Sequence, residues 1–248
     1  MFGFDFSHWN SDADFSIYSK KCDFAFHKGS EGKSYKDPKY RARMIAFPKD
    51  KLFGVFHVVC PKRYTYEEEL KNFYEVIDQT FFYRQCCIAI DLENTPGYVP
   101  YSSGSDVKKW IINFISDLYK RYNKRILVYM GDLYPEDWYK DFKAAGGEIW
   151  ICRYRQKAPN HSCVLWQYTD AYEGHKLDAD KVIDEAVFKS LFTTIDVVQP
   201  VDDIKDLTNA CSIFADYVIK GYFGTGMERK ENIYKMIQKE VNRRYGKE

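Results

Sequence analysis

The sequence lacks the cysteine pattern of a disulfide framework or of a structural zinc site. Its 7 cysteines are an odd number, they are scattered over 248 residues, and no two form a Cys-x-x-Cys pair. Small domains stabilised by disulfides or by zinc need paired cysteines at short spacings. We therefore expect free thiols, with the adjacent Cys86 and Cys87 on opposite faces of a strand.

The sequence also lacks an excess of charge of either sign. Its 37 basic and 36 acidic side chains give a formal net charge of +1 at pH 7, which argues against a surface for nucleic acid. No combination of His, Cys and Asp has the spacing of a metal site, and no glycine-rich loop follows a strand to hold a phosphate. We expect neither a cofactor nor a nucleic-acid partner.

Long apolar segments are absent as well. No run approaches the roughly 18 residues that a membrane span needs. The start of the chain, Met-Phe-Gly-Phe-Asp, has neither the basic residues nor the apolar stretch of a secretory signal. We therefore expect a protein that is made in the cytoplasm and has no membrane span.

Apolar segments rich in aromatic and β-branched residues alternate with helical patterns over about the first 190 residues. Helical spacing predicts helices over residues 66–82 and 107–122, and a third helix after Pro135. Strands are expected at residues 2–6, 24–28, 52–59, 87–93, 125–130, 148–154 and 164–168. This alternation predicts a parallel α/β barrel, in which reactive groups lie where the strands end.

The run of residues 87–93 ends in two acids, Asp91 and Glu93. The two-residue period of a strand puts both on one face, roughly 7 Å apart along the backbone. Acids at the end of a buried strand rarely lack a partner or a task, and a pair with one protonated member can split a glycosidic bond. Asp5 ends the first strand, and Asp178 would join the same rim if residues 176–182 close the barrel. These acids predict a sugar hydrolase.

The composition changes after residue 192. Residues 193–206 carry Thr-Thr, Gln-Pro and Asp-Asp pairs, which are typical of a linker. Two apolar stripes at helical spacing follow, separated by a glycine-rich turn at residues 221–226. We therefore predict a catalytic barrel over 1–192, a linker over 193–206 and a small all-α domain over 207–248.

Seven short blocks follow one another in the first 190 residues. They read GFDFSHW at 3–9, FAFHKGSEG at 24–32, YKDP at 35–38, GVFH at 54–57, IDLE at 90–93, IWICRY at 149–154 and WQY at 166–168. In this order they resemble the glycoside hydrolase family 25 lysozymes, the muramidases of phages and bacteria. The resemblance implies an irregular, TIM-like eight-stranded barrel with few helices. It also implies the MurNAc-β-1,4-GlcNAc bond of peptidoglycan as the substrate.

The resemblance implies roles for the acids. Glu93 would be the general acid, because a carboxyl in a partly apolar barrel mouth beside Asp91 should have a raised pKa. Asp91 would stay ionised, and would stabilise the oxocarbenium-like transition state or orient the N-acetyl group. Asp5 would order the cluster, although it could also cap a turn. The family has Asp-x-Asn where this chain has Asp178-Ala179-Asp180, so we favour Asp178 over Asp180 as the fourth acid.

Other residues are candidates for sugar binding. Tyr129 aligns with a family tyrosine near the reacting sugar, and Gln167 could hydrogen-bond an acetamido group. Trp150 and Trp166 either stack on sugar faces or pack inside the barrel. His57 is expected to be a buried, hydrogen-bonded core histidine rather than a catalytic one.

The C-terminal stretches 215–230 and 237–242 resemble a cell-wall-binding repeat that occurs in tandem in a pneumococcal phage lysin. Here there is one copy, with a shorter loop before its last helix. Phe223 stands where the repeat has tryptophan, and Arg229 matches its arginine, which could hold a peptide-stem carboxylate or be a solvated helix charge. We expect a monomer, or a dimer formed through this domain.

Together these features predict an endolysin-like muramidase that acts on bacterial peptidoglycan. A wall-binding module would raise the concentration of the barrel at its polymeric substrate. The lack of a secretory signal fits a phage lysin that reaches the wall through a membrane lesion, and a bacterial enzyme is the alternative. Two alternatives stay open: a glycan-binding protein without activity, and a hexosaminidase, such as a chitinase, acting on another amino-sugar polymer.

Overall fold

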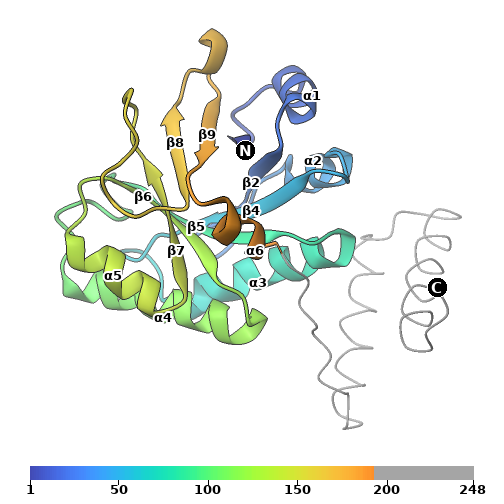
Figure 1. The fold of residues 1–248 in the computed structure, drawn as a ribbon. Coiled ribbons are helices and arrows are strands. Elements are labelled where there is room, and N and C mark those ends of the chain that lie inside the picture. Colours follow the sequence, from blue (N-terminus) through green and yellow to red (C-terminus); the bar gives the residue numbers. More distant parts are fainter. Residues whose placement is uncertain (193–248) are drawn as a thin grey trace, which may run out of the picture. The chain divides into compact units, whose positions relative to one another are not determined.

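The computed structural model describes residues 1–192, which form a closed eight-stranded barrel with helices on its outside (Figure 1). The strands follow one another around the barrel in the order β1-β9-β8-β7-β6-β5-β4-β2, and pairing between β1 and β2 closes it. The short β3 (Tyr35–Lys36) is added to β2. The barrel strands are β1 (Phe2–Phe6), β2 (Phe24–Glu31), β4 (Leu52–Val58), β5 (Cys87–Leu92), β6 (Ile126–Gly131), β7 (Gly147–Cys152), β8 (Leu165–Thr169) and β9 (Asp178–Val182). The predicted α/β barrel is confirmed, with strand ends that move by one to three residues.

One strand departs from the predicted parallel barrel. β9 runs antiparallel to both of its neighbours, β1 and β8, while the other barrel pairings are parallel. Asp178 is therefore the first residue of its strand, not one near its end. Because β9 is reversed, its first residue lies at the same rim as the last residues of the parallel strands. Asp178 therefore lies at the rim as expected, although its strand runs in the opposite direction to the one predicted.

Helices cover the outside of the barrel (Figure 1). The predicted helices are confirmed as α3, α4 and α5; α3 begins with a capping box between Thr65 and Glu68. Pro135 precedes the first turn of α5. Three other helices, α1, α2 and α6, were not predicted, because they have few apolar residues at helical spacing. The helices are α1 (Asp12–Lys21), α2 (Tyr40–Ala46), α3 (Tyr66–Tyr83), α4 (Ser105–Tyr122), α5 (Glu136–Ala144) and α6 (Glu185–Ser190).

The barrel separates two apolar cores. Along β5, Cys87 and Ala89 belong to the inner core, whereas Ile88 and Ile90 belong to the outer core beneath the helices. Cys86 also belongs to the outer core, so the two adjacent cysteines face opposite ways as predicted. Side chains from and just after α6 pack on the phenylalanines at the start of β2 and fill that end of the barrel. The opposite end, where the parallel strands finish, is left for the site.

His57 is the buried, hydrogen-bonded histidine that the sequence predicts. Its ring nitrogens lie 2.8 Å from Ser30 Oγ and 3.0 Å from Glu69 Oε2, and all three residues are fully buried. Burial lowers the pKa of His57 to about 3. This network fixes β2 where its register with β4 shifts, between Lys28 and Ser30.

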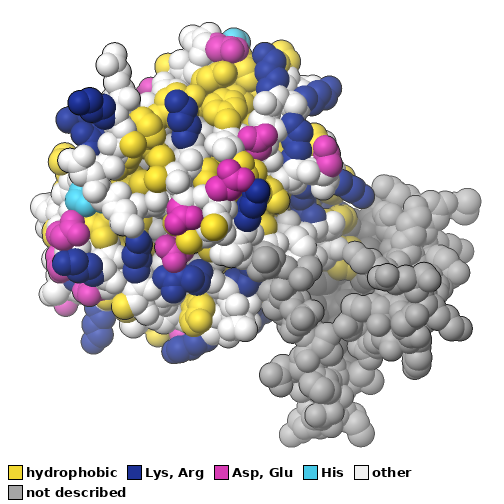
Figure 2. All heavy atoms as spheres, in the orientation of Figure 1, with side chains coloured by type: hydrophobic (Ala, Val, Ile, Leu, Met, Phe, Trp, Pro, Cys, Tyr) yellow, Lys and Arg dark blue, Asp and Glu magenta, His cyan; other side chains and the backbone are white. Residues whose placement is uncertain are grey.

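Acidic and basic side chains are interspersed on the face shown in Figure 2, in keeping with the balanced charge. No helix within residues 1–192 is long and apolar enough to cross a membrane. The cysteines of this part of the chain are free thiols. The predicted linker 193–206 and small domain 207–248, with Phe223 and Arg229, lie outside the described residues.

Candidate active site

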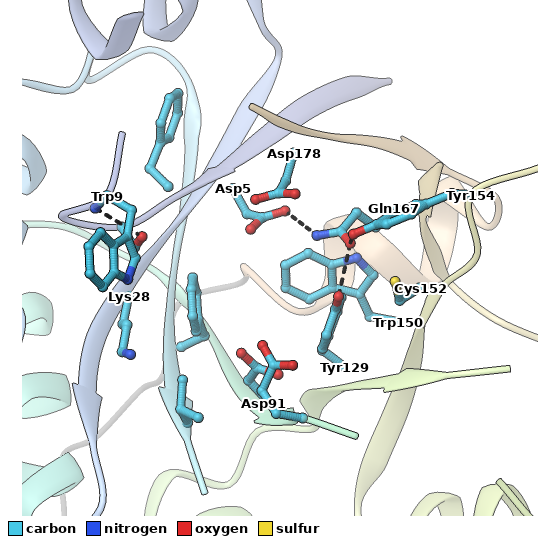
Figure 3. Close-up of a pocket in the computed structure, with 15 residues that line it drawn as sticks. Asp5, Trp9, Lys28, Asp91, Tyr129, Trp150, Cys152, Tyr154, Gln167 and Asp178 are labelled. Carbon is cyan, nitrogen blue, oxygen red and sulfur yellow. Dashed lines mark hydrogen bonds between the residues drawn. The ribbon is translucent and has the colours of Figure 1, made fainter. Parts of the chain in front are cut away.

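Four of the predicted acids line one cavity at the rim of the barrel. The cavity has a volume of about 390 Å³, and Asp5, Asp91, Glu93 and Asp178 all contribute to its wall. Asp5 and Asp178 are paired residues of neighbouring strands, and Asp91 faces them from the other side of the cavity (Figure 3). The alternation of strands explains the placement of Asp91, which continues the inward stripe of Cys87 and Ala89. Glu93 comes directly after β5.

Asp91 and Glu93 influence each other's charge. Burial, and then the charge of Glu93, raises the pKa of Asp91 well above its ordinary value. Glu93 is exposed at the mouth of the cavity, and partial desolvation raises its pKa while Lys28 lowers it. The expectation that Asp91 is ionised during the reaction stays a prediction; burial of Asp91, the deeper of the two carboxyls, acts against it in the free protein. The pair holds a proton over a wide pH range, since the charge of one member opposes ionisation of the other.

Asp5 and Asp178 form the second half of the cluster. Asp5 is 8% exposed, and its Oδ2 accepts a hydrogen bond of 2.8 Å from Gln167 Nε2. Burial raises the pKa of Asp5 to about 6, although hydrogen bonds to its carboxyl act in the opposite direction. Burial, followed by the charge of Asp5, raises the pKa of Asp178 to about 8. Asp180 does not line the cavity; it lies fully buried inside the barrel. The placement therefore favours Asp178 as the fourth acid of the cavity.

Two tyrosines orient the amide of Gln167. The hydroxyls of Tyr129 and Tyr154 donate to Gln167 Oε1 over 2.9 and 2.8 Å. With its oxygen occupied in this way, the amide presents its nitrogen to Asp5 (Figure 3). The structure thus brings the predicted Tyr129 and Gln167 together at the cavity, and it adds Tyr154.

The two candidate tryptophans are placed differently. Trp150 lines the cavity and also packs against Phe26, with ring centroids 4.8 Å apart, so it belongs to both the site and the inner core. Trp166 precedes Gln167 on β8 and is not among the residues that line the cavity. Its Nε1 donates to the Arg153 carbonyl over 2.8 Å. Trp166 is therefore a packing residue in this structure, because adjacent strand residues face opposite sides.

A second hollow continues from the cavity on the far side of Glu93. It has a volume of about 570 Å³ and shares Trp9, Lys28, Val58 and Glu93 with the first. Two further aromatic residues, Tyr35 and Tyr98, line it. The two hollows adjoin at these four shared residues, one of which is Glu93, and together form one cleft.

The sequence profile named "Glycosyl hydrolases family 25" matches residues 4–176. The chain belongs to glycosyl hydrolase family 25. It is therefore a glycoside hydrolase.

Solved structures with the same fold include several family members. A family 25 glycosyl hydrolase from Bacillus anthracis matches with a TM-score of 0.63 and 23% identity, over 78% of this chain and 94% of that one. A bacterial lysozyme from Streptomyces coelicolor matches with a TM-score of 0.61 and 20% identity, over 77% and 95%. The catalytic domain of endolysin ply40, from bacteriophage P40 of Listeria monocytogenes, matches with a TM-score of 0.57 and 17% identity, over 78% and 98%. A search of curated protein sequences gave no significant match.

Three side chains of the family 25 cleft had no predicted role. Lys28 continues the inward stripe of Phe24 and Phe26 and brings a cation to the cavity. Trp9 is 84% exposed at the junction of the two hollows. Tyr154 follows Trp150 and Cys152 at two-residue spacing, all three on the cavity wall. The alternation in these strands is a signal that could have identified Lys28 and Tyr154, whereas nothing in the sequence marks Trp9 as exposed.

The carboxyls of the cleft are not arranged as a metal site. Within residues 1–192, no three His, Cys, Asp or Glu side chains are grouped so that they could hold a metal ion. The charge that balances the acids comes instead from Lys28, whose Nζ lies 2.5 Å from Glu31 Oε2. Burial of the acids and this shared lysine therefore determine where protons are held.

Proposed function

We propose that the barrel is a muramidase, which hydrolyses the β-1,4 bond between N-acetylmuramic acid and N-acetylglucosamine in peptidoglycan. The observation that carries the proposal is the convergence of Asp5, Asp91, Glu93 and Asp178 on one cavity of a family 25 barrel. The proposal is supported by similar structures whose names describe a lysozyme and a muramidase.

Glu93 is the general acid in this mechanism. It is the cluster member at the mouth, between the two hollows, and its raised pKa favours the protonated form that a leaving oxygen needs. Its proton passes to the glycosidic oxygen as the bond to the sugar carbon breaks. Water supplies the hydroxyl of the new reducing end, and the remaining proton of that water replaces the one that Glu93 lost.

Asp91 acts through its charge. It lies deeper in the cavity, opposite Asp5 and Asp178. Positive charge that develops on the sugar ring favours the arrangement in which the proton shared by the pair lies on Glu93 and Asp91 is ionised, so the proton given to the leaving oxygen is the proton of the pair. The same carboxylate can hold the N-acetyl group in place. Asp91 thus stabilises the transition state although burial favours its protonated form in the free protein.

The cleft has room for sugars on both sides of the bond. The inner cavity, walled by Tyr129, Trp150 and Gln167, would take the sugar whose anomeric carbon reacts. The outer hollow would take the leaving sugar, with the exposed ring of Trp9 as a flat surface for its apolar face. Lys28 and Glu31 form an ion pair in the wall of this hollow.

The test is mass spectrometry of the fragments released from purified cell walls. Wild-type protein should release fragments with muramic acid at the new reducing end, and Glu93→Gln should release none. Glu136→Gln, which changes an exposed acid of α5, is the matched control and should behave as wild type. Glucosamine at the new reducing end refutes the proposal in favour of a glucosaminidase. Wall binding by the wild type without any release refutes it in favour of a glycan-binding protein.

We propose in addition that residues 193–206 are a linker, and that residues 207–248 bind the cell wall through Phe223 and Arg229. The support is the resemblance of this segment to a phage-lysin repeat. The chain would then be an endolysin-like muramidase, either a phage lysin that reaches the wall through a membrane lesion or a bacterial enzyme. In a wall-sedimentation assay, full-length Glu93→Gln should bind walls more tightly than a form ending at residue 192, and Arg229→Ala should reduce that difference. Equal binding of the two lengths would argue against a wall-binding segment.

A further inference from the structure

Asp180 is a buried acid for which the mechanism above has no task. It is fully buried on β9, in register with Gly3 of β1 and Gln167 of β8. Its Oδ1 accepts a hydrogen bond of 2.8 Å from Trp150 Nε1, a donor that is itself buried. Its Oδ2 is buried as well, and no donor faces it. One oxygen of this carboxyl is therefore satisfied and the other is not.

The charged groups that act on Asp180 are two other carboxyls. They are Asp5 on β1 and Asp178 on β9 itself. The residues that face it from β7 and β8, Trp150 and Gln167, are neutral. An ionised Asp180 would thus combine the cost of desolvation with repulsion and with a buried oxygen lacking a donor. A proton on Oδ2 removes all three costs at once.

The acid that can accept that proton lies on β1. Asp5 comes two residues after Gly3, the residue paired with Asp180, so the two acids are diagonal neighbours on one face of the β1–β9 pair. Their effects on each other's pKa favour the charged form of Asp5 and the neutral form of Asp180. Those opposite effects are what a hydrogen bond from Asp180 to Asp5 produces. Burial raises the pKa of Asp180 well above its ordinary value, which agrees with the same assignment.

We propose that Asp180 is a positioning residue: a buried carboxylic acid that donates a hydrogen bond from Oδ2 to Asp5. Asp5 then receives two hydrogen bonds, one from Asp180 and one from Gln167 Nε2. Together they fix the Asp5 carboxylate beside Asp178 at the cavity wall. The catalytic consequence rests on the proposed muramidase activity, whereas the protonation of Asp180 does not.

Two substitutions separate donation from mere packing. Asp180→Asn keeps a donor for Asp5 and an acceptor for Trp150, while Asp180→Leu has a similar volume and offers neither. We expect Asn to keep kcat/KM on cell walls within about 3-fold, and Leu to lower kcat by 10-fold or more with a smaller change in KM, since an unpaired buried partner is costly. Asp106→Asn, on the exposed side of α4, is the control for the charge change. Equal losses in Asn and Leu would overturn the proposal, as would full activity in both.

A second measurement does not depend on activity. A group whose pKa is raised on folding binds a proton in the folded state that the unfolded chain has released, so the free energy of unfolding falls as pH rises between the two pKa values. At pH 6, denaturant unfolding of Asp180→Asn should show about one fewer proton bound on folding than the wild type does. An unchanged pH slope in Asp180→Asn overturns the proposal.

The two measurements also distinguish this proposal from the proposed function. If the wild type releases no fragments from walls, the muramidase assignment fails, and the pH slope of Asp180→Asn still decides whether Asp180 is protonated. If Asp180→Leu does not fold, the activity of Asp180→Asn and the pH dependence of its free energy of unfolding are sufficient to test the proposal. The proposal is supported if Asp180→Asn is active and its free energy of unfolding falls less steeply with rising pH than that of the wild type. It is refuted if Asp180→Asn is as inactive as Glu93→Gln.

Discussion

The paired hydroxyls that hold Gln167 give a prediction that can be worked from the geometry. Tyr129 and Tyr154 both donate to Gln167 Oε1, at 2.9 and 2.8 Å, and Gln167 is 3% exposed. Two donors on one oxygen act as substitutes for each other. We therefore expect Tyr129→Phe and Tyr154→Phe to be mild singly and severe together.

The expected sizes follow from hydrogen-bond energies. A single substitution removes one neutral hydrogen bond, with a net worth of about 0.5–1.5 kcal/mol, and leaves the other donor in place. Since about 1.4 kcal/mol corresponds to tenfold in rate, each single variant should lose roughly 2- to 10-fold in kcat/KM. The double variant leaves a buried amide oxygen without a donor, at about 1–3 kcal/mol beyond the single losses. The amide is then no longer held with its nitrogen toward Asp5.

The assay is a double-mutant cycle of kcat/KM on purified peptidoglycan. A coupling energy of about 1 kcal/mol or more, with the double variant worse than the sum, is expected. Tyr119→Phe, at an exposed position of α4, is the control and should be neutral. Losses that add to within about 0.3–0.5 kcal/mol would mean that the two hydroxyls act independently, and the inferred role of Gln167 would be refuted.

Three further predictions concern the rest of the cleft and the barrel. Lys28→Met removes a charge that lowers the pKa of Glu93, so the basic limb of the kcat/KM pH profile should move to higher pH; an unmoved limb would contradict this. Trp9→Ala should raise KM for soluble glycan chains about 2- to 10-fold with little change in kcat, if an aromatic face contributes about 0.5–1.5 kcal/mol; an unchanged KM speaks against an outer sugar site. Gly54→Ala should destabilise the protein by about 1–3 kcal/mol in urea unfolding, because an added Cβ would overlap a buried ring of β2. Gly104→Ala, with open space around it, should cost at most about 1 kcal/mol.

The sequence predicted β5 and its acids well because two independent patterns agree there. The apolar run identifies a buried strand, and the two-residue spacing of Asp91 and Glu93 fixes a common face. The alternation of Cys87, Ala89 and Asp91 then continues into the inner core of the structure. Where a strand alternates cleanly in this way, sequence alone determines which side chains reach the cavity.

Strand direction and register were harder to predict. Nothing in residues 176–182 distinguishes a parallel strand from the antiparallel β9 that is observed. On β8, Trp166 and Tyr168 each carry an aromatic ring with a polar group, and Gln167 between them is polar. This run therefore has no clear apolar alternation, and the pairing with the neighbouring strand determines which side chains face inward. Cys152 of β7 is in register with Gln167, and that pairing turns Gln167 inward and Trp166 outward. These features depend on contacts between distant segments, which a local pattern does not contain.

The location of each acid in the barrel accounts for the division of labour in the site. Asp180 is the most buried and has carboxyls as its charged neighbours, so it holds a proton that it gives only in a hydrogen bond. Asp5 receives that bond and a second from Gln167, so it is the acid best supported as a carboxylate. Glu93 lies at the mouth, where, in the proposed mechanism, water would return the proton that it donates. A gradient of burial from the inside of the barrel to its rim would therefore separate an acid that positions from an acid that reacts, without any difference in the chemistry of their carboxyl groups.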